Sequence, residues 1–281
     1  SLPTRRSSDL TTVRPGVVFG NSSTAAPAKR GGSNPRRLYS SARGMDLLYR
    51  QYRGNNCYVY PEHQDHDPGH NGRPGHGDVF PTNTPYVLIS QGSSGSDLPF
   101  LGLWAEALAA LRPDVKERLK AEGLLMPALQ QVFRSTSTRI ERPEDILTGK
   151  AHPTVFCAQD IDALATVRAA HALAVDALPP MIQLHVLEEE PAEPGDAYHE
   201  FARAEQLADT PAGIARIHRR RARDLRLTIS AAKSFDLNDR PLTFRWVVLR
   251  GDPERIRIEP RDNGTRAELT IGWHGRFPVE P

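Results

Sequence analysis

Apolar residues recur at intervals of three and four positions between residues 98 and 178, which is the spacing of amphipathic helices. The first predicted helix presents an apolar face made of Leu98, Leu101, Ala105, Leu108 and Leu111. Pro113 opens a second helix, because proline is favoured at the first helical position, and further helices are predicted over residues 127–137 and 160–173. This part of the chain is therefore expected to be mainly helical.

The period changes after Pro179 and Pro180, which end the helical pattern. Residues 182–186 alternate apolar and polar side chains, as a half-buried strand does. Further β-rich runs follow at residues 213–217, 225–230, 242–249, 256–258 and 267–271. Several short strands at this spacing predict a β-sandwich.

The amino-terminal part is less regular. Residues 11–43 are rich in Gly, Ser, Pro, Ala and Arg and bury little apolar surface, so we expect a loose arm there. Residues 1–10 resemble a translated sequencing adapter, and we expect them to be foreign and the natural amino terminus to be missing. Ordered structure is predicted from Met45 to Tyr60, ending in a short strand, and a second strand is predicted over residues 86–90.

One run in the carboxyl-terminal part resembles a known family of domains. Residues 227–246 look like the B–C strand hairpin of PKD-type, immunoglobulin-like domains, which carry a Ser-x-Asp motif, an Asp/Asn-rich turn and a Pro-Leu-x-x-x-Trp core strand. The matching positions are Ser234, Asp236, Asn238, Asp239, Pro241, Leu242 and Trp246. Trp246 is expected to point inward with Phe244 and Val248 and to fill the space between two sheets.

The resemblance covers residues 181–281 and departs from the family in two places. A long insertion precedes residue 225, and the chain stops before the expected final strands, so we expect a truncated sandwich. The expected fold class is α+β, with a strand-plus-helices unit over residues 44–178 followed by this PKD-like sandwich. Because PKD-type domains are usually accessory modules of exported enzymes and surface proteins, the resemblance implies a bacterial envelope or extracellular location and a binding or spacer role.

Charge and cysteine content limit the binding partners and the disulfides that can be expected. The 36 Lys and Arg residues against 34 Asp and Glu residues leave a net charge of +2, too balanced to predict binding to nucleic acid or to an anionic membrane. No apolar run approaches the length of a membrane span. Cys57 and Cys157 are too few for a disulfide framework, and a single bridge between them stays open.

A polar loop at residues 61–84 is unusually rich in His and Asp. A loop of this length inside a compact chain needs a function or an ordering agent. Its candidate metal ligands are His63, Asp65, His66, Asp67, His70, His76 and Asp78. Imidazole with carboxylate suits Zn²⁺ or another first-row metal, whereas an Asp subset with backbone carbonyls suits Ca²⁺. The alternative is a polar loop whose side chains hydrogen-bond the backbone and one another.

A Gly/Ser-rich turn lies between the second predicted strand and the first predicted helix, where a backbone can bind anions or present a nucleophile. Its candidate ligand-binding residues are Gly92, Ser93, Ser94, Gly95, Ser96 and Asp97. Ser93 is a candidate nucleophile with His171 or His152 as its base, but Gln91 stands where the Gly-x-Ser-x-Gly pattern needs its first glycine. A third interpretation is a tight connection in which Ser96 or Asp97 caps the helix.

Two functions stay open from these residues. The leading hypothesis is a non-catalytic secreted or cell-surface protein that binds carbohydrate or another envelope polymer, with other domains of a longer protein as further partners. The alternative is a hydrolase, metal-dependent or serine-based, that uses the His/Asp-rich loop and the Ser93 turn. A divalent metal, Zn²⁺ or Ca²⁺, is the cofactor that the residues suggest.

Overall fold

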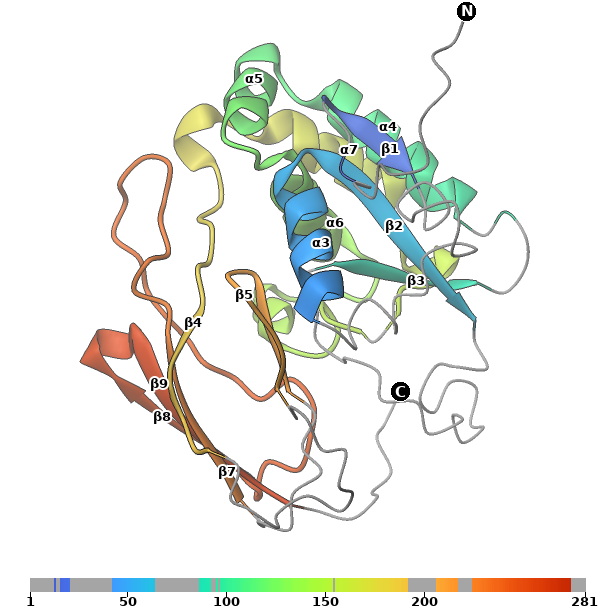
Figure 1. Cartoon of the computed structure of the whole chain (residues 1–281). Helices are drawn as coiled ribbons and strands as arrows, with labels where there is room; N and C mark the ends of the chain where they lie inside the picture. The colour runs from blue at the N-terminus through green and yellow to red at the C-terminus, as the bar shows by residue number, and fades with distance from the viewer. Residues whose placement is uncertain are drawn as a thin grey trace, which may run out of the picture.

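The computed structural model describes residues 13, 16–20, 42–63, 86–91, 95, 97–153, 155–191, 206–216 and 224–273 (Figure 1). Within these ranges the chain is a mixed α/β structure with five α-helices, a three-stranded parallel sheet, and antiparallel sheets of four and two strands. The helices surround the parallel sheet, and the antiparallel strands lie beside this unit. The expected order of elements along the chain, a strand-plus-helices unit followed by a β-rich part, is confirmed.

The parallel sheet has the strand order β1–β2–β3. Its strands are β1 at Val18–Gly20, β2 at Asn56–His63 and β3 at Val87–Gln91. Parallel strands need a crossover connection, and helix α3, at Ala42–Arg53, lies between β1 and β2 in the chain. Beyond β3, Phe156 forms an isolated parallel bridge with Ile89 and extends the sheet by one short segment.

Strand β1 corrects one prediction. It lies within residues 11–43, which were expected to be a loose arm, and it pairs with β2 from Val18 opposite Asn56 to Gly20 opposite Tyr58. The only signal in the arm is the short apolar run from Val17 to Phe19, which is too short to predict a strand by itself. Its order comes from the hydrogen bonds that the edge of β2 offers.

The predicted helices are all present, with small shifts of their ends. They are α4 at Leu98–Ala110, α5 at Pro113–Ala121, α6 at Leu125–Thr136 and α7 at Ala163–Ala172. Short 3₁₀ turns lie at Pro143–Leu147, Ala158–Asp160 and Val175–Ala177. Gly123 joins α5 to α6 with a φ of +66°, where a side chain is disfavoured. None of the described helices has the length and apolar character needed to cross a bilayer.

The buried face of α4 differs from the predicted one. The buried residues are Phe100, Leu103, Trp104 and Ala107. Leu98, which was expected in the core, is 66% exposed, and Leu111 is the one fully buried member of the predicted face. Nearly every position of this helix is apolar, so periodicity alone does not select a face. The helix is oriented by its two large aromatic rings, because they bury the most apolar area.

Different elements cover the two faces of the parallel sheet. One face packs against α4 and α6 and carries Cys57, Val59, Val87 and Ile89. In the same cluster Trp104 of α4 meets Phe133 of α6 edge-on, with their ring centroids 5.3 Å apart. The opposite face packs against α3 and carries Tyr58 and Tyr60. Burial on both faces explains the continuous apolar and aromatic run at the start of β2.

The larger antiparallel sheet has the strand order β4–β7–β9–β8. Its strands are β4 at His185–Glu189, β7 at Asp224–Ser230, β8 at Ile256–Arg261 and β9 at Arg266–Gly272. A separate hairpin is formed by β5 at Gln206–Thr210 and β6 at Gly213–Arg216. The predicted turn between β8 and β9 is confirmed, with positive φ at Asp262, Asn263 and Gly264.

Residues 242–249 were expected to form the core strand that carries Trp246, and this prediction is wrong. The segment belongs to none of the described sheets, although its exposure alternates and Trp246 is half-buried. Trp246 packs on the apolar face formed by Leu225, Leu227 and Ile229, and its Nε1 donates a hydrogen bond of 2.7 Å to the carbonyl oxygen of Gly264. The alternation of more and less exposed side chains was therefore predicted correctly. The strand itself was not, because pairing also needs a free edge of a neighbouring strand.

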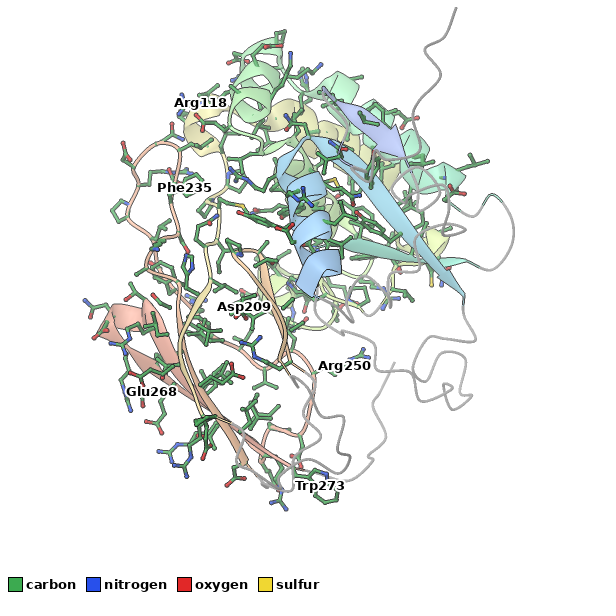
Figure 2. All side chains as sticks on the ribbon, in the orientation of Figure 1. Arg118, Asp209, Phe235, Arg250, Glu268 and Trp273 are labelled. Carbon is green, nitrogen blue, oxygen red and sulfur yellow. The ribbon has the colours of Figure 1, made fainter. Side chains whose placement is uncertain are left out.

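The β-rich part packs directly on the helical part through a loop at residues 235–240. Figure 2 shows Arg118 of α5 and Phe235 of this loop close to that junction. Arg118 donates a hydrogen bond of 3.4 Å to the carbonyl of Leu237, and Asn238 donates one of 2.9 Å to the carbonyl of Val175. Strand β5 and helix α3 also share a buried cluster. Buried contacts thus cross the boundary predicted at residues 178–181.

Candidate functional site

The carboxyl ends of β2 and β3 lie side by side at one edge of the parallel sheet. His63 is the last residue of β2 and is in register with Gln91, the last residue of β3. Ligands of parallel α/β sheets bind outside the carboxyl ends of the strands. The His/Asp-rich loop and the Gly/Ser-rich turn therefore start from neighbouring backbone positions at the edge where ligands usually bind.

The turn between β3 and α4 is described at two of its residues. Gly95 has a φ of +89°, and its carbonyl oxygen accepts a hydrogen bond of 3.0 Å from the amide of Leu98. Asp97 occupies the N-cap position of α4, but its backbone is helical and its side chain makes no capping hydrogen bond. The predicted cap at Asp97 is therefore wrong, because a helical backbone there carries the carboxylate away from the first amides. The alternative cap, Ser96, lies outside the described residues.

Most of the predicted site residues lie outside the part of the chain that the structure describes. They are Asp65, His66, Asp67, His70, His76, Asp78, Gly92, Ser93, Ser94 and Ser96. The backbone of His63 is placed, at the end of β2. Metal binding by the loop and a nucleophilic role for Ser93 both stay predictions.

His171, the predicted base for Ser93, lies near the carboxyl end of α7. Its Nδ1 is 3.1 Å from the carbonyl oxygen of Ala110, the last residue of α4. Gly95 and Asp97 precede the first residue of α4, and a helix of 13 residues is about 20 Å long. His171 thus lies at the far end of α4 from the described part of the turn, which argues against its acting as the base for Ser93.

His152 is also unsuited to act as a base. Its Nε2 is 3.1 Å from the carbonyl oxygen of Ile146. Burial, together with the nearby positive charge of Arg134, lowers the pKa of His152 to about 4. The ring is therefore neutral at neutral pH and is held by the backbone, which indicates a structural role.

A buried arginine that the sequence did not single out lies near Phe156, at the end of the parallel sheet. Arg134 of α6 donates a hydrogen bond of 2.7 Å to the carbonyl of Ala151, and its guanidinium carbon lies 5.1 Å from the ring centroid of Phe156. These contacts fix the segment beside β3 to the helical layer. An arginine directly after Phe133, inside a predicted apolar helix, was the signal that could have identified it.

Both cysteines are buried, and neither forms a disulfide. Cys57 lies in β2 opposite Phe19 of β1, and burial raises the pKa of its thiol to about 12. Cys157 follows Phe156 on the far side of β3. The bridge that the sequence left open is therefore not formed, and a thiol with a pKa this high is a weak nucleophile at neutral pH.

Within the described ranges, no group of three or more His, Cys, Asp or Glu side chains is arranged to hold a metal ion. Two buried carboxylates of the helical part serve local structure. Asp145 accepts a hydrogen bond of 3.2 Å from Lys150, and Asp160 accepts one of 2.7 Å from Arg139. Neither is therefore a candidate ligand.

Trp273 is a surface feature that the sequence analysis missed. It directly follows β9, is 71% exposed, and lies at the end of the larger sheet (Figure 2). Side chains alternate along a strand, so Trp273 continues the face of Leu269 and Ile271. An exposed aromatic ring offers an apolar packing surface to a ring-shaped ligand.

The chain matches no protein-family model, no curated protein and no solved structure. Its function is therefore inferred from its own residues.

Proposed function

We propose that the protein binds its ligand at the carboxyl edge of the β1–β2–β3 sheet, through a divalent cation held by the His/Asp-rich loop. The observation that carries this proposal is the register of His63 with Gln91, which starts the loop and the Gly/Ser-rich turn from adjacent strand ends. Side chains presented from neighbouring strand ends converge on one small volume, as they do in parallel α/β sheets.

The donor set of the loop fits a divalent cation. It comprises His63, Asp65, His66, Asp67, His70, His76 and Asp78. Imidazole with carboxylate favours Zn²⁺, and an oxygen-only subset favours Ca²⁺. A bound cation would offset the mutual repulsion of the aspartates and would order a loop that buries little apolar surface of its own.

The ligand class we propose is an extracellular carbohydrate or another polymer of the cell envelope. Neutral oxygen donors such as sugar hydroxyls are ligands that hard cations accept. The exposed ring of Trp273 supports this class, because sugar rings present apolar C–H faces that pack on aromatic rings. Trp273 therefore serves as a second contact surface.

The resemblance of residues 181–281 to PKD-type domains supports an envelope or extracellular location. In support of this, Asp236 and Asn238 lie in a hydrogen-bonded turn and Trp246 packs on Leu225, Leu227 and Ile229, although residues 242–249 form no strand. We propose that this part is a PKD-like accessory module in which the β5–β6 hairpin and residues 242–249 take the place of a complete second sheet. Its role is to bind or to space other domains of a longer protein.

The first experiment measures metal in the purified full chain. Elemental analysis after dialysis should find about one Zn²⁺ or Ca²⁺ per chain. The variants His66→Ala and Asp67→Ala should lose the metal. His171→Ala is the matched control, because that histidine is exposed and lies at the far end of α4. A metal-free wild-type protein after incubation with both cations would contradict the proposal.

The second experiment measures retention on insoluble envelope polysaccharides with and without a chelator. The wild-type protein should be retained in the presence of the cation and released by the chelator. Trp273→Ala should weaken retention while metal content stays unchanged, which separates the two contact surfaces. Retention that neither the chelator nor Trp273→Ala reduces would remove both surfaces from the ligand site.

A metal-dependent hydrolase is the second candidate function. The observation that favours it is the strand–turn–helix from β3 through Gly95 to α4, beside the end of β2, since this geometry presents reactive groups in many α/β enzymes. A cation there would supply an activated water. Cation-dependent cleavage of model esters or phosphoesters, lost in Asp67→Ala, would establish this function. The serine-based version predicts fluorophosphonate labelling that Ser93→Ala abolishes.

A further inference from the structure

Helix α4 is apolar on more than its buried side. Glu106 is the one charged residue among its 13 residues. Its inner face is buried against the parallel sheet and α6. A helix that is apolar all round normally has protein on every side, whereas a surface helix has a polar outer face.

The outer face of α4 is nevertheless open. Leu98 is 66% exposed. The other exposed residues of this helix are Pro99, Gly102, Ala105, Glu106 and Ala109. A side-chain carbon placed on Gly102 would meet no atom within 4 Å, which confirms the open space beside the helix. Apart from Glu106, the exposed positions are apolar or small.

Helix α7 lies beside α4 and runs in the same direction. Both helices start from the carboxyl edge of the parallel sheet, α4 after β3 and α7 after Phe156, which is bridged in parallel to Ile89. Near their other ends, His171 of α7 contacts the carbonyl of Ala110 of α4. Residues of α7 therefore lie level with residues of α4 that are about 61 positions earlier in the chain.

The outer face of α7 continues that of α4. Leu164 is 60% exposed, and it lies level with the first half of α4, within two turns of Leu98. The charged or titratable residues of α7 are Arg168 and His171. Two adjacent helices thus present one surface with exposed leucines at one end and small residues along its length, here named the α4–α7 surface.

We propose that the α4–α7 surface is the interface between two copies of this chain, related by a two-fold axis. The surface carries one acidic residue, Glu106 on α4, and one arginine, Arg168 on α7. In the described part of the chain, neither forms an ion pair of its own. The two residues lie at nearly the same level on neighbouring parallel helices.

A two-fold axis that runs between the two helices and parallel to them brings α4 of one copy onto α7 of the other. Glu106 of each copy then faces Arg168 of the other copy, and the two reciprocal ion pairs lie about one turn beyond the paired leucines. A two-fold interface is self-complementary in this way, because each contact is made twice. Small residues such as Gly102 and Ala105 allow close approach of the helices.

The test is the association state of the full chain, measured by sedimentation velocity over a range of protein concentrations. The wild-type protein should form a dimer, and Leu98→Lys and Leu164→Glu should each raise the dissociation constant at least about tenfold. Leu187→Glu is the matched control, because Leu187 is 49% exposed on β4, away from this surface. Unchanged thermal melting of the variants at low concentration would show that they are folded.

A charge exchange tests the geometry of the pair. Glu106→Arg and Arg168→Glu should each dissociate the dimer, because each variant places like charges opposite one another. Mixing the two variants should restore association, since the introduced arginine then meets the introduced glutamate and the native Arg168 meets the native Glu106. A wild-type chain that stays monomeric, or a dimer that survives Leu98→Lys and Leu164→Glu, would overturn the proposal.

Discussion

The guanidinium of Arg240 holds the carboxylate of Asp236, with Nε 3.0 Å from Oδ2, and also donates to the carbonyl of Asp176, at 3.1 Å, and to that of Leu178. Asp236 begins the Asp/Asn turn and Arg240 directly follows that turn, whereas the two carbonyls belong to the end of the helical part. A single arginine therefore joins the two parts of the chain. Its hydrogen bonds lower the pKa of Asp236 to about 2.

This pair predicts a specific acid sensitivity. A carboxylate whose pKa is lowered on folding contributes stability above its unfolded pKa, near 4, and loses that contribution as the pH falls through about 2. Asp236→Asn should melt at a lower temperature at neutral pH, and its melting temperature should depend less on pH between 4 and 2. Asp239→Asn is the control, because Asp239 has a φ of 55°, which Asn adopts readily. Equal acid sensitivity in Asp236→Asn and the wild type would contradict this assignment.

His152 predicts a second pH dependence, at higher pH. Because folding lowers its pKa to about 4, the unfolded chain binds a proton there first, so stability is complete above about 6.5 and falls as the pH is lowered toward 4. The effect should amount to roughly 1–3 kcal/mol. His152→Gln should flatten this part of the curve of unfolding free energy against pH. A variant with an unchanged slope from pH 7 to pH 5 would show that the loss arises elsewhere.

The ion pairs of Arg216 predict that β4, β5 and β6 contribute to stability as one coupled unit. Its side chain is 6% exposed and contacts Glu189 at 2.7 Å and Asp209 at 2.7 Å. Arg216→Met should cost about 3 kcal/mol of unfolding free energy, because two carboxylates lose their partner. Urea titration of Arg216→Met, Glu189→Leu and the double variant measures the coupling. The double variant should lose less unfolding free energy than the sum of the losses in the two single variants. Losses that simply add would refute the coupling.

Gly123, between α5 and α6, lies so close to the end of α3 that a side chain at this position should destabilise the fold. A side-chain carbon at this position would lie 2.3 Å from the carbonyl oxygen of Arg53, and its φ of +66° also disfavours a side chain. Gly123→Ala should therefore lower the unfolding free energy by roughly 2–4 kcal/mol. Gly149→Ala is the matched control, because the nearest atom, the carbonyl oxygen of Leu249, would be 3.7 Å away. Comparable losses for the two variants would contradict the steric explanation.

Local chemistry of the sequence was sufficient for the helices and turns. Pro113 opens α5 and Gly123 follows it, as their backbone preferences require. The turn from Asp262 to Gly264 was identified from residues that tolerate positive φ. For the candidate site, the sequence supplied the donors of the His/Asp-rich loop and the glycine of the turn, but not the relation between them.

Tertiary structure decided how these pieces face one another. Strand β1 exists because β2 offers it an edge, and the face of α4 was selected by the rings of Phe100 and Trp104. Residues 242–249 kept their predicted alternation without joining a sheet. The register of His63 with Gln91 likewise depends on strands far apart in the chain. A repeating pattern fixes which side chains share a face, but the partner of that face is set by packing between distant residues.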